Sequence, residues 1–209
     1  MTATPIPRTL SLTLFGDLDV SSIDALPPGR QPIDTRVVGP EKTDDVYRYI
    51  AGRVDKGEQL YVVVPTVDDG ELGLKAVRSH AEAIESTWFA NHRVAAIHGQ
   101  LKRPTREAIM DRFRRGEIHV LVATTVIEVG VDVPNASLMI VEHAERFGLA
   151  QLHQLRGRIG RGNTRSLCVF IAEPTTDDAV GRMDAINSTT DGFVIAEKDL
   201  EIRGMGELI

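Results

Sequence analysis

The sequence contains one cysteine, Cys168, among 209 residues, and few aromatic residues, 5% in all. A disulfide within the chain is therefore excluded, and Cys168 is most simply a buried, reduced thiol of a cytosolic protein. The scarcity of aromatics argues against a platform on which nucleic-acid bases stack. No apolar run approaches the roughly 18 residues of a membrane-spanning helix, and no signal-peptide pattern is present, so we expect no membrane contact.

Patterns that hold the phosphates of a nucleotide are also missing. The chain has no Gly-Lys dipeptide, and hence no P-loop to cradle phosphates. No acidic magnesium motif follows a strand, no second histidine or cysteine stands at metal-ligand spacing from His98, and no serine or cysteine triad is evident. The formal net charge is -6, so any nucleic-acid binding must use a local basic patch.

Short apolar runs alternate with helical patterns along most of the chain. Strands are predicted at 33–38, 60–64, 94–97, 120–123, 138–141 and 167–171. Helices are predicted at 43–56, 72–90, 104–115, 149–158, 177–187 and 191–202. Because most of the apolar runs are continuous, they indicate a parallel sheet that is buried on both faces, in an α/β fold. The last two helical patterns predict a hairpin appended to the sheet domain.

A glycine-rich segment near the carboxyl end concentrates positive charge. Four arginines lie within ten residues: Arg156, Arg158, Arg161 and Arg165. A helix over 151–161 would put Gln154, Arg158 and Arg161 on the face opposite its apolar side chains, and Arg156 on a different face. Guanidinium groups suit phosphate oxygens, and glycines allow the backbone to approach a ligand closely. A solvated basic helix end is the alternative.

The residues after the predicted strand 120–123 stand where an open parallel sheet binds ligands. Thr125 and Glu128 have the spacing of a capping box, which predicts a short helix whose free N–H groups suit a phosphate. Capping alone explains Glu128, whereas Thr124 and Thr125 combine capping with phosphate contact. Asp132 either accepts a hydrogen bond from a ribose hydroxyl or orders the following turn.

His98 ends the predicted strand 94–97 and so lies at the same edge. We interpret it as a histidine that hydrogen-bonds a loop. The helix 104–115 is rich in arginine and turns Ile109, Met110 and Phe113 inward. A solvated basic helix is the simpler interpretation, and a contribution to nucleic-acid binding is the alternative.

Three segments in this order, 2–4, 124–132 and 154–161, resemble motifs III, V and VI of superfamily 2 helicases. The sequence resembles most closely the RecG family of bacterial branch-migration and fork-regression helicases, and 191–204 is similar to the translocation motif of that family. The resemblance implies a RecA-like second helicase lobe with an appended helical hairpin. It divides the chain into the end of the first lobe with a linker (1–30), the second lobe (31–175) and a truncated hairpin (176–209).

The resemblance also implies a role for individual residues. Arg158 and Arg161 would be arginine fingers that reach the γ-phosphate of ATP. The residues implied to border the nucleotide are Gly130, Asp132, Gln154, Arg158 and Arg161. Those implied for DNA contact are Thr124 and Thr125, and those for coupling nucleotide state to movement are Thr2, Thr4 and Arg203.

The resemblance implies that ATP and Mg²⁺ are held mainly by a first lobe that this chain lacks. The implied partners are branched or duplex DNA and the P-loop lobe and wedge domain of the same parent chain, in the bacterial cytoplasm. Both ends look like those of an excised piece. Because the P-loop lobe is missing, we expect the isolated chain to be inactive. The alternatives are the corresponding lobe of a transcription-repair coupling translocase and a lobe that binds nucleic acid without catalysis.

Overall fold

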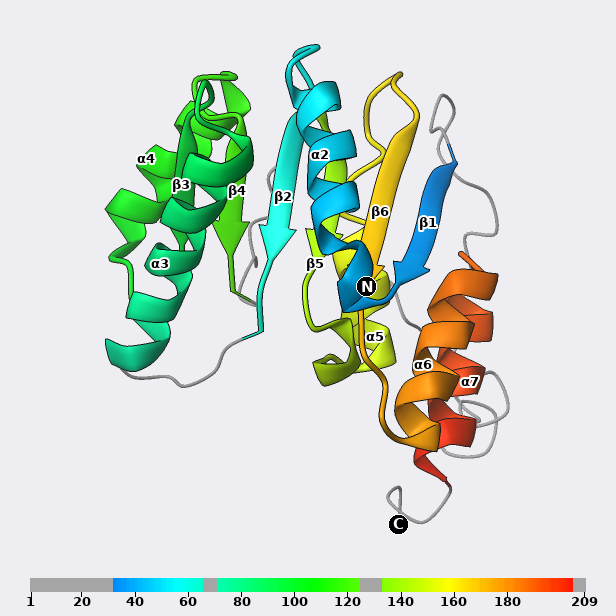
Figure 1. Cartoon of the computed structure of the whole chain (residues 1–209). Coiled ribbons are helices and arrows are strands. Elements are labelled where there is room, and N and C mark those ends of the chain that lie inside the picture. Colours follow the sequence, from blue (N-terminus) through cyan, green and yellow to red (C-terminus); the bar gives the residue numbers. More distant parts are fainter. Residues whose placement is uncertain (1–31, 66–70, 125–132, 205–209) are drawn as a thin grey trace, which may run out of the picture.

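The computed structural model describes residues 32–65, 71–124 and 133–204, which form one parallel sheet with helices on both faces (Figure 1). The strands are β1 (Ile33–Val38), β2 (Gln59–Val63), β3 (Val94–Ile97), β4 (Val120–Ala123), β5 (Ala136–Val141) and β6 (Ser166–Ile171). The helices are α2 (Thr43–Val54), α3 (Glu71–Trp88), α4 (Arg103–Arg114), α5 (Leu149–Arg156), α6 (Asp177–Ser188) and α7 (Gly192–Arg203), with short 3-10 turns η1 (Pro40–Lys42) and η2 (Ala144–Arg146). The predicted strands and α/β class are confirmed.

The strands lie in the order β1-β6-β5-β2-β4-β3, and every neighbouring pair is parallel. The carboxyl ends of all the strands therefore meet at one edge of the sheet, which is the lower edge in Figure 1. We call it the carboxyl edge. Segments that are far apart in the sequence come together there because each strand of a parallel sheet delivers its following loop to the same side.

Two apolar layers cover the sheet. Side chains of α2 and α3, including Tyr47 and Ile84, pack on one face, together with alternate residues of the central strands. Side chains of α4, α5 and the α6–α7 hairpin, including Phe113 and Ile195, pack on the other face. Every residue of β2, β4, β5 and β6 is buried, which is why these strands are continuous apolar runs in the sequence.

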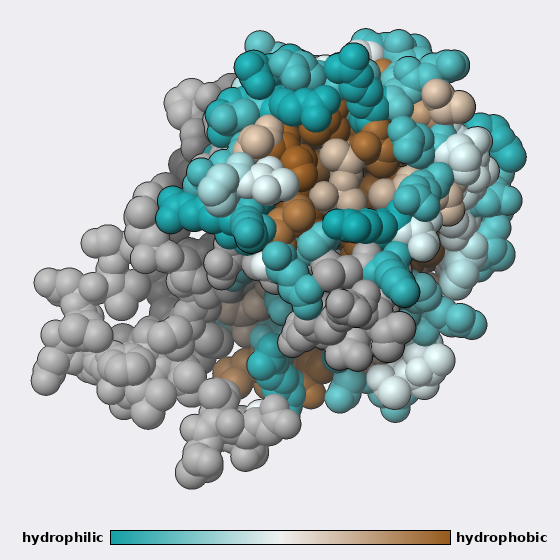
Figure 2. Space-filling model, turned by 90° about the vertical axis from the view of Figure 1, so that its left-hand side faces the viewer, coloured by the Kyte–Doolittle hydropathy of each residue, from teal (hydrophilic) through white to brown (hydrophobic). Residues whose placement is uncertain are grey.

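The two edge strands differ from the central ones. β1 carries Asp34 and Arg36, and its residues are partly buried or exposed. β3 is short, and Val94, Ala95 and Ala96 are partly buried. Figure 2, which views the molecule from the side where Figure 1 places β3, α3 and α4, shows an apolar area framed by hydrophilic residues. Within the described part of the chain, no helix has the length and apolar character needed to cross a bilayer.

The end of α4 is fastened to the sheet by a buried amide. The Gln59 side chain donates hydrogen bonds to the carbonyl oxygens of Phe113, at 2.6 Å, and Ile118, at 2.8 Å. The Phe113 ring is fully buried and lies 5.0 Å from the Tyr61 ring, between centroids. This contact joins α4 to β2 at the centre of one apolar layer.

Truncation of Phe113 tests this packing. We expect Phe113→Ala to lower the free energy of unfolding by about 3–5 kcal/mol, because it removes buried apolar surface and leaves a cavity. Val180→Ala, which shortens an exposed side chain, is the control and should change it by less than about 0.5 kcal/mol. Urea unfolding followed by circular dichroism measures both, and equal small effects would contradict the packing described.

Candidate functional site

Two polar residues, His98 and Thr124, stand side by side at the carboxyl edge, where the adjacent strands β3 and β4 end. The Thr124 amide donates a hydrogen bond to the carbonyl oxygen of Ile97, at 3.3 Å, so Thr124 and His98 follow adjacent strands at the same level. Both are buried, and His98 is 6% exposed. Burial, and secondarily the charge of Arg78, lowers the pKa of His98, so its imidazole is neutral at neutral pH.

The His98 side chain is only partly satisfied. Its Nδ1 is buried and has no hydrogen-bond partner among the residues that the structure describes. We interpreted His98 as a histidine whose side chain hydrogen-bonds a loop, and among the described residues Nδ1 makes no such bond. The main chain of His98 does bond within the loop, since its carbonyl oxygen accepts from the Leu101 amide at 3.1 Å.

The amino end of α4 follows this loop. Lys102 is its N-cap and makes no side-chain cap hydrogen bond, and the first turn contains no acidic residue. Arg103 pairs with Glu107 at 2.7 Å, one turn further on. Pro104 in the first turn supplies no N–H. The helix dipole, the remaining free N–H groups and the neighbouring cations together favour an anion at this helix end. Met110 and Phe113 are buried as expected.

The predicted helix over 151–161 is too long. Helix α5 ends at Arg156, and Gly157 is its C-cap. The Arg158 amide bonds to the Leu155 carbonyl oxygen at 2.9 Å in a tighter final turn, and Gly160 then takes φ +82°. That left-handed conformation ends helical geometry and favours glycine. Arg158 and Arg161 therefore do not share one helical face.

The apolar residues of 151–161 are nevertheless buried, and the polar residues of the opposite face are more exposed, as the sequence predicted. Leu152, Leu155 and Ile159 are buried, whereas Gln154 and Arg161 are exposed and Arg158 is half-buried. Gly162 explains one glycine of the segment, since a Cβ there would lie 2.4 Å from the Pro134 carbonyl oxygen. This close approach is to the protein's own backbone, whereas the sequence suggested a ligand.

Arg156 is buried, and the sequence did not indicate its role. The helical pattern indicated only that Arg156 lies on a different face from Arg158 and Arg161. Its exposed fraction is 2%. The guanidinium donates to the carbonyl oxygens of Ile186, at 2.7 Å, and Thr189, at 2.8 Å, at the carboxyl end of α6. It also donates to Thr35 Oγ1 of β1, at 3.5 Å. Burial lowers the pKa of Arg156, and the nearby Cys168 partly offsets this.

The α6–α7 hairpin is also attached through its other end. Arg182 of α6 donates to the carbonyl oxygen of Glu145 in η2, at 3.0 Å. At the end of α7, Arg203 is exposed and pairs with Asp199 at 3.1 Å. Its Nη2 lies 3.6 Å from the place a Cβ on Gly148 would occupy, so Arg203 lies beside the N-cap of α5. The predicted hairpin is confirmed.

A partly buried polar cluster lies where β5 ends. Glu142 accepts hydrogen bonds from Tyr47 Oη of α2, and its Oε1 is 3.1 Å from His80 Nε2 of α3. Burial alone would raise the pKa of Glu142, but His80, Tyr47 and His143 outweigh it and lower the pKa. Burial and the Glu142 charge raise the pKa of Tyr47 well above its ordinary value. The sequence pattern carried no sign of this cluster, because its members are far apart in the chain.

The remaining predicted site residues fall in segments that the structure does not describe. They are Thr2, Thr4, Thr125, Gly130 and Asp132, together with the predicted helix start at Thr125 and Glu128. Their roles stay predictions.

The sequence matches the family described as "Helicase conserved C-terminal domain" over residues 41–163. Curated relatives named ATP-dependent DNA helicase RecG are 48% identical in Synechocystis sp., over 210 residues, and 49% identical in Escherichia coli K12, over 217 residues. Each match covers the whole chain but 25% and 30% of the relative, respectively. The chain thus spans about a quarter to a third of the length of these relatives.

Solved structures agree with these matches. The chain aligns over its full length with "Structure of RecG bound to three-way DNA junction", with a TM-score of 0.82 and 41% identity, and covers 27% of that chain. It also aligns with the second domain of the DEAD-box helicase Mss116p, with a TM-score of 0.57 and 20% identity over 76% of this chain and 62% of that one. The latter likeness shows a shared fold alone.

The Glu142 cluster predicts a pH dependence of stability. The pKa of Glu142 is lower in the folded chain than its ordinary value of 4.5. The ionised carboxylate therefore stabilises the folded chain above pH 4.5, and this stabilisation is lost as the pH falls through the folded pKa. We expect Glu142→Gln to cost roughly 1–3 kcal/mol at neutral pH, through loss of charged hydrogen bonds. The gap from wild type should shrink on acidification below pH 4.5.

Urea unfolding at a series of pH values measures this gap. Glu117→Gln is the matched control, because Glu117 is 40% exposed and pairs with Arg112 at the surface, where such pairs are worth about 0–1 kcal/mol. A Glu142→Gln effect of the same size from neutral to acidic pH would contradict the role given to the carboxylate charge.

Proposed function

The chain belongs to the helicase conserved C-terminal domain family, and we propose that it is the second motor lobe of a RecG-type ATP-dependent DNA helicase that remodels branched DNA in recombination and repair. The full-length structural match to a RecG bound to a DNA junction carries this proposal. The lobe of a transcription-repair coupling translocase is the alternative, and the RecG relatives reported above do not favour it. A lobe without catalytic function is a further alternative.

For the nucleotide, we propose that Arg158 and Arg161 stabilise charge on the phosphates of ATP, with Gln154, Gly130 and Asp132 beside it. The exposed Arg161 and the half-buried Arg158 suit this purpose, because guanidinium groups match phosphate oxygens and act on the charge that develops during phosphoryl transfer. ATP and Mg²⁺ would be held mainly by a P-loop lobe of the parent chain, since this sequence has no Gly-Lys dipeptide.

For DNA, we propose that phosphates contact the carboxyl edge at Thr124 and Thr125 and at the amino end of α4. Three features support the second contact: the first turn of α4, which has no side-chain cap; the cations Lys102 and Arg103; and the buried Nδ1 of His98, which has no hydrogen-bond partner within 32–65, 71–124 and 133–204. Such contacts read the backbone and not the bases, so binding would depend strongly on salt and little on sequence.

For coupling, we propose that the α6–α7 hairpin follows movements of α5. Arg156 joins α5 to the carboxyl end of α6, and Arg203 lies beside the N-cap of α5. A displacement of the arginine-bearing segment would thus be passed to the hairpin through packed, hydrogen-bonded elements. Thr2 and Thr4 would connect nucleotide state to DNA grip from the other end of the chain.

We propose that the chain has three parts: the end of the first lobe with a linker (1–30), the second lobe (31–175) and a truncated hairpin (176–209). The remaining partners would be the P-loop lobe and the wedge domain of the parent chain, together with branched or duplex DNA. The buried thiol of Cys168, whose pKa burial raises to about 12, is consistent with a place in the bacterial cytoplasm.

Arg161→Ala in the parent enzyme tests the assignment to the nucleotide. We expect DNA-stimulated ATP hydrolysis to fall by about 10³–10⁵-fold, because an arginine finger acts on the transition state. Binding of a fluorescent ATP analogue should stay close to that of wild type. Arg114→Ala, at an exposed arginine near the end of α4, is the control and should keep its activity. Equal losses in binding and turnover would refute the assignment.

Arg203→Ala tests the coupling role. We expect the variant to hydrolyse ATP at about half the wild-type rate or better while fork unwinding falls at least about tenfold, since the side chain contacts the motor without touching the nucleotide. Parallel ATPase and strand-displacement assays on one forked substrate measure the ratio. Normal unwinding, or a loss of hydrolysis that matches the loss of unwinding, would show that Arg203 does not couple the two.

A further inference from the structure

A groove lies between the edge strand β1 and helix α2, on the sheet face that α2 and α3 cover elsewhere. Its volume is about 510 Å³, within the range of pockets that hold ligands, about 300–1,000 Å³. In Figure 1, α2 lies over the middle of the sheet, and no helix of the described residues lies over β6 and β1 on this face. A sheet face in an α/β fold is ordinarily covered by a helix or another chain segment.

The floor of the groove is apolar. It is formed by Val38, Val46, Ile50, Leu167 and Val169. Tyr49 of α2 stands at its side and is 62% exposed. Only Tyr49 and Val180 are exposed large hydrophobic residues in the described part of the chain. Aliphatic walls beside one exposed aromatic ring favour the burial of an apolar side chain over the stacking of successive bases.

The rim of the groove is positively charged. Four cations, Arg36, Lys42, Arg53 and Arg165, line it with only two carboxylates, Asp34 and Asp45. Asp34 already pairs with Arg36, at 3.1 Å, and Asp45 with Arg48, at 3.3 Å. Glu58 pairs with Arg53 at 2.6 Å, and Arg165 lies 3.9 Å from Asp34. Cations still outnumber carboxylates around the apolar floor, although the net charge of the whole chain is -6.

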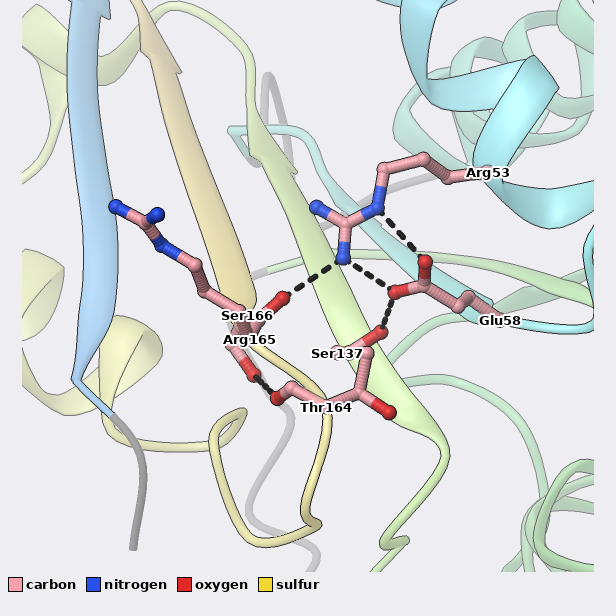
Figure 3. Close-up of polar contacts among 6 residues, drawn as sticks. All are labelled: Arg53, Glu58, Ser137, Thr164, Arg165 and Ser166. Carbon is pink, nitrogen blue, oxygen red and sulfur yellow. Dashed lines mark hydrogen bonds and ion pairs between the residues drawn. The ribbon is translucent and has the colours of Figure 1, made fainter.

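One side of the rim is held in place by a polar network (Figure 3). Arg53 donates to both carboxylate oxygens of Glu58, at 2.7 and 2.6 Å, and to the main-chain oxygen of Arg165, at 2.7 Å. Ser137 donates to Glu58 in turn. The Arg165 side chain points away from this network toward β1 and is 80% exposed. The cationic rim is therefore ordered on one side before any ligand binds, which lowers the entropic cost of binding.

We propose that this groove binds a peptide segment of a partner protein in which a large apolar side chain is flanked by aspartate or glutamate. The apolar side chain packs against Tyr49 and the floor. The acidic side chains pair with Arg36 and Arg165, which share the single carboxylate of Asp34, at 3.1 and 3.9 Å, in the free chain. The groove uses none of the residues assigned to ATP, DNA or coupling, so the inference does not depend on the motor function.

Selection from random sequence tests this directly. A phage library of random dodecapeptides is panned against the whole chain, and enriched peptides are made with a fluorescein label for anisotropy titrations. We expect enrichment of a large apolar residue with adjacent Asp or Glu, and binding that weakens as salt screens the charges. Tyr49→Ala and Arg36→Glu should each raise the Kd of an enriched peptide by about tenfold or more, as for residues central to a small interface.

Two matched variants serve as controls. Arg115→Glu reverses a side chain that is 65% exposed, as Arg36 is, and that pairs with a carboxylate two residues away in the same manner. Val180→Ala shortens the other exposed hydrophobic residue. Both should stay within about twofold of wild type. Because Tyr49 and Arg36 are exposed, their variants should keep the wild-type unfolding curve, and peptide-induced protection of α2 and β1 from hydrogen exchange gives a second readout.

Several outcomes would overturn the proposal. They are failure of the library to enrich any sequence, enrichment of basic sequences, and enriched peptides whose Kd is unchanged by Tyr49→Ala and Arg36→Glu. Binding of single-stranded oligothymidine or of anionic phosphatidylserine vesicles that depends on these two residues would assign the groove to nucleic acid or membrane instead.

Discussion

The buried guanidinium of Arg156 is the interaction on which the arrangement of this chain depends. It joins α5 to the end of α6 and, through Thr35, to the edge strand β1. A buried charge is costly unless its donors are satisfied. Here the last carbonyl groups of a helix supply acceptors, at the end where the helix dipole also favours a cation. The hairpin is therefore attached to the sheet domain by a buried, hydrogen-bonded guanidinium.

The four arginines of the glycine-rich segment act in different environments although they are close in sequence. Arg156 is buried, Arg158 is half-buried, and Arg161 and Arg165 are exposed. The backbone between them separates their directions, because α5 ends at Arg156 and Gly160 adopts φ +82°. Arg165 faces Asp34 of β1. One cluster in the sequence thus becomes a structural clamp, two candidates for nucleotide contact and one side of a groove.

The parallel sheet separates these functions in space. Its carboxyl edge gathers His98, Thr124 and Glu142, each directly after a strand. Glu142 binds side chains of α2 and α3, and the chain then continues through η2 into α5. Glu142 therefore connects the α2–α3 layer of the sheet to the segment that carries the arginines. The groove beside β1 meets this segment only at Arg165, whose main-chain oxygen accepts from Arg53 at the amino end of β6, opposite the carboxyl edge.

The sequence by itself determined the α/β class, all six strands and the position of each helix to within a few residues. It could do so because strands buried on both faces must be apolar throughout, and a helix with one buried face must repeat its apolar residues at helical spacing. It also indicated that Arg156 points away from its neighbours.

Only the tertiary structure decided where α5 ends, what Arg156 binds, and that Tyr47, His80 and Glu142 form one cluster. These features depend on contacts between residues far apart in the chain, which no local pattern records. The direction of the chain beyond α5 depends on the φ of +82° at Gly160, a conformation that glycine permits but does not impose. Strand order and side-chain direction, which bring Arg36, Tyr49 and Arg165 around one groove, likewise follow from packing of the whole sheet.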